Sequence, residues 1–318
     1  MKLSVVLCTF NRSESLKSTL ESIVASQVPN EVAWEVLVVD NNSTDDTREV
    51  VQKFCGSHPK CRYIFEQKQG LSHARNAGIR QAKGDVIAFV DDDVTVDPHW
   101  LGNLSLPLEH LPWAGAGGRI RAQRNVELPK WVRLEGPFSM GGSLAALFDR
   151  GDSPSELHEP PYGTNMAYRK CMFDKHGYFR TDLGRTGKGM IGQEDIEFGE
   201  RLISAGERIW YEPAAIVFHP VLPERLNKKY FLSWWFGCGQ STVRKAGVQP
   251  GKWGIPRHVL TSGMVVVTSL KWFRSLDPVE RFFWKCWTWM YMGKTVENYR
   301  QASEGKTDAS RSLARSRE

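Results

Sequence analysis

The stretch Val86-Ile87-Ala88-Phe89-Val90-Asp91-Asp92-Asp93 decides the fold that we predict for this chain. Five consecutive apolar residues are typical of a strand that is buried on both faces, as in a parallel sheet covered by helices. Three carboxylates follow at once and repel one another, which a fold tolerates where a cation neutralises them. The stretch therefore predicts a buried strand that ends at a cation site; an exposed acidic turn is the alternative.

Strand and helix patterns alternate through residues 1–98 around this stretch. In the segment that follows Ser13, for example, Leu16, Leu20 and Ile23 fall on one helical face, and Ser13 is a suitable N-cap. The alternation predicts an α/β fold with a doubly wound, mainly parallel sheet and helices on both faces. The expected strands are 3–9, 34–40, 62–65 and 86–90, and the expected helices are 13–25, 44–54 and 71–82.

The rest of the chain is less regular as far as residue 162, is ordered again over residues 163–219, and is mainly helical after Asn227. The run Gly115-Ala116-Gly117-Gly118 is not followed by a helical pattern, so we interpret it as a loop or the edge of a strand. Residues 302–318 carry one large apolar side chain, Leu313, which is too little to offset the entropy of ordering. We expect a disordered tail there.

The composition is that of a globular protein, with 41% hydrophobic and 25% charged residues, and so excludes a fibrous or disordered chain. The six cysteines form no Cys-x-x-Cys pair, which favours a reduced compartment. Cys55 and Cys61 are expected to be free thiols, with a bridge between them as the alternative. No run of 18 apolar residues occurs, and residues 1–7 resemble a strand more than a signal peptide. We therefore expect a cytoplasmic protein without a transmembrane helix.

Residues 223–318 differ from the rest in charge and in aromatic content. They hold 17 Lys and Arg against 7 Asp and Glu, together with seven of the twelve Trp. Basic residues interleaved with Trp favour peripheral attachment to an anionic membrane surface, on the inner face of the plasma membrane. A Trp-rich helical core with a solvated basic face is the alternative. No basic-aromatic module of a nucleic-acid-binding protein is present, so we expect no nucleic acid partner.

Five sequence blocks in order resemble the family 2 glycosyltransferases, which are nucleotide-sugar enzymes with the fold called GT-A. The blocks are residues 4–12, 38–45, 70–78, 89–93 and 193–198. The resemblance implies a GT-A catalytic domain over residues 1–222, with a nucleotide-binding half (1–98) and an acceptor-side half (99–222). A basic, Trp-rich helical extension (223–301) and the tail (302–318) follow. The implied reaction is sugar transfer with inversion at the anomeric carbon.

The resemblance also implies which residues bind the donor. Asp40, at a strand end, corresponds to the carboxylate that hydrogen-bonds the nucleoside, and Thr9, Asn11 and Arg12 are expected to line the base pocket. Arg75 corresponds to the arginine on the nucleotide side, where a fixed cation also steadies the diphosphate. A helix cap is the alternative role for Asp40, and a surface ion pair is the alternative for Arg75.

A divalent metal ion, Mn²⁺ or Mg²⁺, is the cofactor that the acidic triplet predicts, because these ions prefer oxygen ligands. Side chains alternate along an extended chain, so Asp91 and Asp93 are expected to face one ion, while Asp92 points aside towards the donor. The ion would stabilise the departing diphosphate as a Lewis acid. His219 resembles a further metal ligand of some relatives; a purely structural histidine is the alternative.

Inversion requires a base that takes the proton of the acceptor hydroxyl. The resemblance assigns this role to Asp195, near the start of a predicted helix whose dipole favours the ionised carboxylate. Glu194 is the alternative base. Asn165, in the segment Gly163-Thr164-Asn165-Met166, is expected to contact the donor.

The expected function is transfer of a single sugar from a nucleotide sugar, with a UDP-sugar as the expected donor. The acceptor would be a glycan or a lipid-linked molecule of surface polysaccharide or glycoconjugate biosynthesis. Processive synthases are disfavoured because the chain lacks a Gln-x-x-Arg-Trp motif, of which Gln240-Ser241-Thr242-Val243-Arg244 is a partial echo. The alternatives are a sugar-nucleotide pyrophosphorylase, whose glycine-rich basic N-terminal loop is absent, and a non-catalytic carbohydrate-binding relative.

Overall fold

The computed structural model divides the chain into two compact units, which are described separately. It describes residues 1–109, 112–123, 127–134, 136–140, 142–143, 146–187, 189–247, 249, 251–252 and 255–315, without side-chain detail for Glu224 and for residues 305–315. Unit 1 comprises Met1–Val126, Leu144–Lys188 and Glu194–Val221. Unit 2 comprises Glu127–Ser143, Gly189–Gln193 and Leu222–Glu318. Two short segments within the first 222 residues thus belong to the helical second unit.

Unit 1 is built on one mixed sheet, whose nine strands in the described residues run in the order β3-β2-β1-β4-β8-β6-β9-β5, with β7 beside β9. The first four strands are mutually parallel, and β6 is parallel to β9, whereas β8, β5 and β7 run antiparallel to their neighbours. The strands are β1 (Lys2–Thr9), β2 (Ala33–Asp40), β3 (Cys61–Phe65), β4 (Val86–Val90), β5 (Thr95–Val96), β6 (Trp113–Ala122), β7 (Ser155–Leu157), β8 (Met166–Arg169) and β9 (Arg208–His219).

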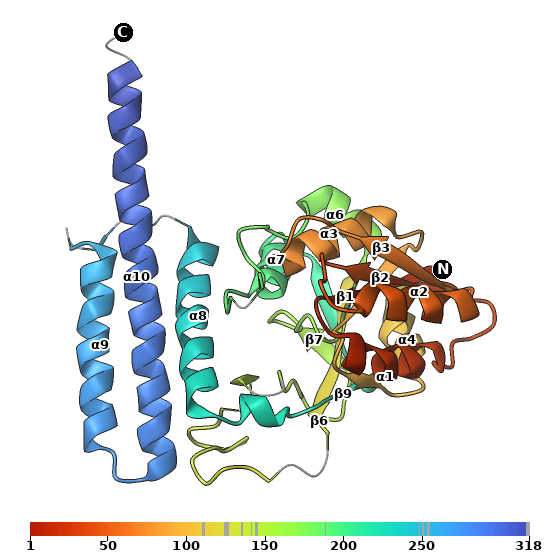
Figure 1. The fold of residues 1–318 in the computed structure, drawn as a ribbon, viewed down its shortest axis with the longest axis horizontal. Helices are drawn as coiled ribbons and strands as arrows, with labels where there is room; N and C mark the ends of the chain where they lie inside the picture. Colours follow the sequence, from red (N-terminus) through yellow and green to blue (C-terminus); the bar gives the residue numbers. More distant parts are fainter. Residues whose placement is uncertain are drawn as a thin grey trace. The chain divides into compact units, whose positions relative to one another are not determined.

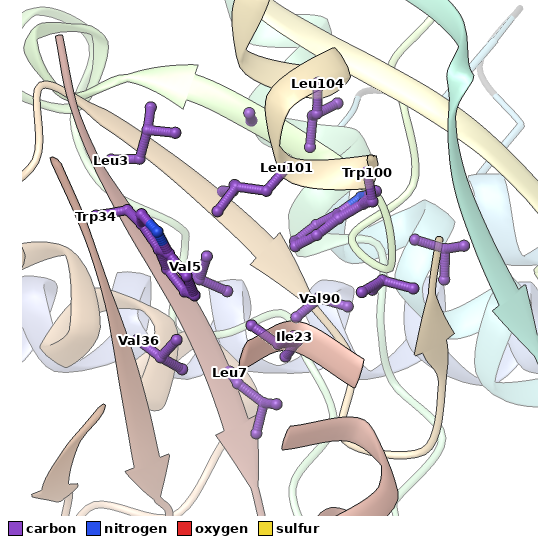
Figure 2. Packing of buried hydrophobic residues seen from close by; sticks show 14 of the residues in the cluster. Leu3, Val5, Leu7, Ile23, Trp34, Val36, Val90, Trp100, Leu101 and Leu104 are labelled. Atoms are coloured by element: carbon purple, nitrogen blue, oxygen red, sulfur yellow. The ribbon is translucent and has the colours of Figure 1, made fainter. Parts of the chain in front are cut away.

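Helices cover both faces of this sheet, as the alternating pattern predicted. Along β1, Leu3, Val5 and Leu7 face one apolar cluster while Val6 faces another, as the two-residue period of a strand requires. The first cluster, part of which Figure 2 shows, also receives side chains from α1 (Ser13–Val24), α2 (Thr47–Ser57) and α4 (Trp100–Ser105). The second receives side chains from α3 (Leu71–Gln81), α6 (Lys170–His176) and α7 (Glu194–Ser204). A 3-10 turn, η1 (Leu106–Glu109), follows α4.

The glycine run at residues 115–118 lies in β6, between β8 and β9, which corrects its assignment to a loop or a strand edge. A side chain at these positions would collide with residues of the neighbouring strand and of the segment that packs on the sheet. A Cβ at Gly115 would lie 2.7 Å from Tyr168 Cε1, and one at Gly117 would meet the Pro161 ring. Glycine therefore allows neighbouring residues to approach the β6 backbone closely, and it does not form a turn here.

Two local expectations were also wrong. Ser13 is the first residue of α1, Arg12 occupies the N-cap position without a capping side-chain bond, and the Ser13 N–H donates to Asp45 Oδ2. Cys55 and Cys61 are joined by a disulfide rather than free, because α2 and β3 bring their Cα atoms within 4.8 Å of each other. Neither change affects the layers of the fold.

In the described residues of unit 2, three long helices form a layer: α8 (Lys228–Ala246), α9 (Arg257–Arg274) and α10 (Pro278–Arg315), preceded by the 3-10 turn η2 (Pro223–Arg225). Within the unit α10 lies between α8 and α9 (Figure 1). Close approach of α8 and α10 requires glycine: a Cβ at Gly239 would meet the Met290 carbonyl, and one at Gly293 the Phe236 carbonyl. The backbone of α10 is helical as far as Arg315, so it continues through much of the segment expected to be a disordered tail.

The two short segments of unit 2 pack on these helices. The ring of Trp131 lies edge-on to Phe231 and Phe282, and the backbone N–H of Gly192 donates a hydrogen bond to Ser241 Oγ over 2.9 Å. Across the part of the chain that the structure describes, no helix is both long enough and apolar enough to cross a membrane.

Candidate active site

The loops that follow β1 and β2 are hydrogen-bonded to each other at one edge of the sheet. The strands are parallel and in register, with Thr9 opposite Asp40, so both chains leave the sheet at the same level. Asn11, in the left-handed region at φ 52°, donates its backbone N–H to Ser43 Oγ and accepts a hydrogen bond from Thr44 N at Oδ1. The expected base-pocket residues Thr9, Asn11 and Arg12 and the expected nucleoside ligand Asp40 thus lie on adjacent loops, as open α/β sheets place ligand sites.

The Asp40 carboxylate is engaged by groups of the protein itself. Oδ1 accepts a hydrogen bond from Ser43 N over 2.9 Å, and Oδ2 accepts one from the Tyr63 hydroxyl over 2.8 Å. Burial, together with the charge of Asp40, raises the pKa of Tyr63 to about 12. The carboxylate is almost fully buried, and its bond to Ser43 N closes a turn before α2, whose N-cap is Asp46, so Asp40 does not cap that helix.

The three aspartates after β4 face three different groups. Thr164 Oγ1 donates to Asp91 Oδ2 over 2.5 Å, whereas Thr9 Oγ1 donates to Asp92 Oδ2 over 2.8 Å. Asp93 lies near Arg12, with 3.6 Å between Oδ2 and Nη1. That Asp91 and Asp93 bind one ion stays a prediction, because both carboxylates have partners within the protein here. Alternation applies to an extended chain, but β4 ends at Val90 and the triplet enters a turn.

His219, the last residue of β9, faces the third aspartate. Its Nε2 lies 3.8 Å from Asp93 Oδ1, and both side chains are buried. Its Nδ1 lies 2.8 Å from the Pro220 carbonyl oxygen, which can only accept, so Nδ1 carries the proton. Nε2 is then the ring nitrogen that is directed towards the carboxylate. Two electron-rich atoms facing each other fit a shared cation, and a backbone carbonyl that fixes the tautomer is typical of metal-binding histidines.

A complete metal-binding cluster is not preassembled. Among the described residues, no three His, Cys, Asp or Glu side chains converge in a way that could hold a metal ion. Asp93 and His219 are candidates for two of the ligands. For Mg²⁺ and similar ions this is ordinary, because one or two protein ligands are commonly completed by water and by the phosphates of a substrate.

The side chain of Arg75 is buried and lies between two carboxylates, so it does not form the surface ion pair that was the alternative for this residue. Its Nη1 lies 2.5 Å from Glu194 Oε1, and its Nη2 lies 3.7 Å from Asp91 Oδ1. Burial raises the pKa of Glu194 to about 7, although the charge of Arg75 acts against this rise. The guanidinium also lies over the rings of Phe89 and Phe179. It therefore links the end of β4 to the start of α7.

Asp195, the expected base, lies one residue further along α7 and is only partly buried. Its Oδ2 accepts a hydrogen bond from the backbone N–H of Gly163 over 2.6 Å, and its Oδ1 accepts one from Ile196 N over 2.8 Å. Thr164, the neighbour of Gly163, is the residue that donates to Asp91. One dipeptide before β8 thus connects the acidic triplet with the carboxylate that sequence assigned as the base.

Asn165 does not contact an open site, and that prediction is wrong. It is completely buried, its Oδ1 accepts a hydrogen bond from Trp100 Nε1, and its Nδ2 donates to the carbonyls of Arg119 and Ala215. The polar side chain of this segment that reaches the triplet is Thr164, which sequence reasoning missed. Both residues are polar and adjacent, so only the direction of each side chain separates them.

Comparisons with known proteins show the family of this chain and its fold. A sequence profile described as glycosyl transferase family 2 matches residues 4–177, more than half of the chain. The chain belongs to glycosyl transferase family 2. The matched region of this glycosyltransferase contains Thr9, Asp40, Arg75 and the acidic triplet, whereas Asp195 and His219 lie beyond its end.

Curated relatives of this glycosyltransferase act on glycoconjugates and polysaccharides, as their names state. A glucosyl-dolichyl phosphate glucuronosyltransferase from Haloferax volcanii is 30% identical over 253 residues, which cover 76% of this chain and 77% of the relative. The succinoglycan biosynthesis protein ExoM of Rhizobium meliloti is 28% identical over 288 residues, covering 89% of this chain and 88% of ExoM.

Solved structures show the same GT-A fold. Mannosyltransferase PcManGT from Pyrobaculum calidifontis, in complex with GDP-Man and Mn²⁺, aligns with a TM-score of 0.59 at 17% identity, over 93% of this chain and 86% of PcManGT. Residues 1–349 of S. aureus TarS, in complex with UDP, align with a TM-score of 0.53 at 17% identity, over 95% of this chain and 92% of that structure. At this identity the likeness concerns the fold alone.

Proposed function

We propose that this glycosyltransferase moves a single sugar, with inversion, from a nucleotide donor to a glycan or lipid-linked acceptor, with Asp195 as the base. The observation that carries the proposal is the pair of hydrogen bonds from Gly163 N to Asp195 and from Thr164 Oγ1 to Asp91. It ties the carboxylate proposed as the base to the acidic triplet through two consecutive residues. The two hydrogen bonds would fix the distance between the base and the leaving-group site, so that a donor sugar bound between them can be attacked opposite its diphosphate.

The nucleotide is proposed to bind on the loops after β1 and β2. Thr9, Asn11 and Arg12 lie there together with Asp40, and Asp92 is joined to this group through Thr9 Oγ1. The Arg12 side chain is partly exposed beside Asp93, where its cation suits a diphosphate. UDP and GDP-mannose are the nucleotide ligands of the related solved structures. We propose a UDP-sugar as the donor.

The metal is proposed to be Mn²⁺ or Mg²⁺, held by Asp93 and His219 together with oxygens of the donor diphosphate. Asp91, which faces Thr164 and Arg75, is the proposed third carboxylate near the ion. When bound, the ion would neutralise charge on the departing diphosphate. PcManGT and GalNAc-T7 were both solved with Mn²⁺, which supports the choice of a divalent cation.

Asp195 suits the base better than Glu194 does. Glu194 is buried and its Oε1 is occupied by Arg75, so it is poorly placed to meet an acceptor hydroxyl. Asp195 is partly exposed, and the two backbone N–H groups that bind it orient its carboxylate without taking part in a reaction. A base must lie within hydrogen-bonding reach of the proton that it removes. Arg75 is proposed as a positioning residue that holds Glu194 and Asp91.

The acceptor is proposed to be lipid-linked, so that the protein works at the cytoplasmic membrane surface. The relative from Haloferax volcanii acts on a dolichyl phosphate, as its name states. A non-catalytic carbohydrate-binding relative remains the competing proposal, and it predicts no donor turnover. A pyrophosphorylase would instead release the sugar 1-phosphate from a nucleotide sugar in the presence of pyrophosphate.

The proposal is tested by incubating the purified chain with a panel of UDP-, GDP- and dTDP-sugars and measuring release of the nucleoside diphosphate, with Mn²⁺ and with EDTA. We expect slow hydrolysis of one donor that requires the metal and is lost in Asp195→Asn. Release that occurs equally in EDTA would reject the metal, and no release from any donor would favour the non-catalytic relative.

A further inference from the structure

The outer surface of α9 is apolar and exposed over its whole length. Its exposed large side chains are Val259, Met264, Val266, Val267, Leu270 and Phe273, and Leu276 follows directly after the helix. Leu270 is 56% exposed and Phe273 67% exposed. Spacings of three and four residues place most of them on one side of the helix. A contiguous apolar face of this kind marks a surface that something else covers.

The opposite side of α9 packs against α10 within unit 2. Thr295 Oγ1 donates to Thr261 Oγ1 over 2.9 Å, and Thr288 Oγ1 donates to Thr268 Oγ1 over 3.1 Å, so α10 lies against that side. In Figure 1 α9 is the outer helix of the layer, beside α10 and not between two neighbours. The exposed face of α9 is therefore not needed for the core of the unit.

The tryptophans of unit 2 do not form this face, contrary to the sequence-based interpretation. The six that the structure describes in residues 223–318 are all partly buried, and several pack on one another, as Trp235 does on Trp287 and Trp272 on Trp289. They form the Trp-rich helical core that was the alternative. Aliphatic residues and Phe273, not indoles, make up the exposed surface.

The charged residues of α9 indicate which kind of partner covers its apolar face. The helix has no Asp or Glu, no charged residue lies between His258 and Lys271, and cations stand at both ends, Arg257 at the start and Lys271 and Arg274 at the end. Two copies paired through this face would bring cation against cation in either orientation, which disfavours self-association. The same cations would attract a surface that carries negative charge.

The carboxylate nearest in sequence to these cations is already engaged. Asp277 accepts a hydrogen bond from Glu280 N over 2.8 Å and forms an ion pair with Arg133. Lys271 lies over the ring of Trp284, which leaves its ammonium group charged and at the surface. The positive charge at the end of α9 therefore remains available to a partner.

We propose that α9 is a bilayer-docking helix that lies in the headgroup region of an anionic membrane. Its apolar face enters the acyl boundary, and its terminal cations meet lipid phosphates. At 18 residues the helix is about 27 Å long, and it is not apolar enough to span a bilayer. Docking requires only the exposed side chains, so the inference does not depend on the chemistry of sugar transfer.

The test is flotation of the full-length chain with vesicles of pure phosphatidylcholine and of phosphatidylcholine mixed with phosphatidylglycerol. The wild type should bind the mixed vesicles, and binding should weaken as salt is raised. Leu270→Gln/Phe273→Gln should lower the partition constant at least about 10-fold through lost apolar burial. Lys271→Gln/Arg274→Gln should lower it by about 10-fold or more on the mixed vesicles only.

Leu106→Gln is the matched control, because Leu106 in η1 of unit 1 is 57% exposed, nearly the same as Leu270. It should leave vesicle binding unchanged, and thermal unfolding should show that every variant is folded. Equal partition of the wild type and Leu270→Gln/Phe273→Gln would overturn the proposal. So would light scattering that shows a wild-type dimer which the same double substitution converts to a monomer, since α9 would then be covered by a second copy. Donor hydrolysis by the double variant should be unchanged, which separates this proposal from the proposed function.

Discussion

The backbone N–H of Gly163 donates a hydrogen bond to Asp195 Oδ2 over 2.6 Å, and this bond fixes the direction of the carboxylate at the start of α7. Glycine is required at position 163, because a Cβ there would collide with the guanidinium of Arg75. A main-chain donor orients Asp195 without transferring a proton to it. The carboxylate is thus presented as an acceptor of a proton from elsewhere, which suits a base.

Replacing Asp195 with asparagine should abolish transfer while nucleotide binding remains. Asparagine keeps one oxygen that can accept from Gly163 N but loses the acceptor of Ile196 N, and its amide cannot take up a proton. Loss of general-base catalysis should lower kcat by about 100-fold to 10,000-fold. Calorimetric titration with UDP and Mn²⁺ checks binding, and a transfer assay checks kcat.

Glu200→Gln is the control for this substitution, because Glu200 is an exposed acid on the same helix and donates no hydrogen bond to Asp195. It should leave kcat unchanged. If Asp195→Asn retained most of its turnover, another group would have to be the base, and Glu194 would be tested next.

Removing the imidazole of His219 should weaken metal binding. If Nε2 and Asp93 hold one ion, as their 3.8 Å separation suggests, His219→Ala removes a ligand and should raise the Kd for Mn²⁺ at least about 10-fold. Titration calorimetry with Mn²⁺ in the presence of UDP measures this change. His158→Ala, at an exposed position, should bind Mn²⁺ as the wild type does. Equal affinities of the two variants would return His219 to a structural role.

The ion pair of Arg75 and Glu194 should contribute strongly to stability, because both groups are buried. Arg75→Ala leaves an uncompensated carboxylate and should lower the free energy of unfolding by about 3 to 5 kcal/mol. Arg75→Met/Glu194→Leu removes both charges and should cost much less. Urea unfolding of the two variants and the wild type measures the difference, and equal losses in both would show that packing, not charge, is at stake.

The loss in free energy of unfolding caused by Arg75→Ala should also depend on pH. Burial raises the pKa of Glu194 to about 7 from the ordinary 4.5, and Arg75 opposes this rise. Without Arg75, the folded protein would keep a proton on Glu194 at pH values where the unfolded chain has lost it. Stability falls with rising pH wherever the folded state binds more protons. The deficit should therefore be larger at about pH 8 than at about pH 5.

The strands of the first half of the sheet were predictable from sequence, since short continuous apolar runs between turn residues are typical of buried parallel strands. Val86–Val90 is a strand at the expected residues, and the polar ends of β1, β2 and β4 lie at one edge of the sheet. The parallel direction of these strands follows from the alternating helices, which must cover both faces. These features depend on the local sequence and a general rule of packing.

Side-chain direction at the site was not predictable in the same way. Asp91 and Asp93 were assigned to one ion by strand alternation, but the strand ends one residue too early for that rule. Asn165 was expected at the site, but Thr164 reaches it and Asn165 points into the core. Neighbouring side chains point in opposite directions, so an error of one residue changes which of them faces the site. Such outcomes depend on partners distant in sequence, such as Trp100, which binds Asn165.

The glycines of β6 provide a test of how tightly the sheet is packed behind the site. A Cβ at Gly118 would meet the Ala215 carbonyl oxygen and the Asn165 side chain, whose amide binds Trp100, Arg119 and Ala215. Gly118→Ala should therefore lower the free energy of unfolding by about 1 to 3 kcal/mol or more through overpacking. Gly56→Ala is the matched control, because Gly56 lies in α2 with nothing within 4 Å of a new Cβ. Since alanine favours a helix over glycine, the control should be neutral or stabilised by up to about 1 kcal/mol. Urea unfolding compares the two variants, and equal stability would mean that β6 can shift to accept a methyl group.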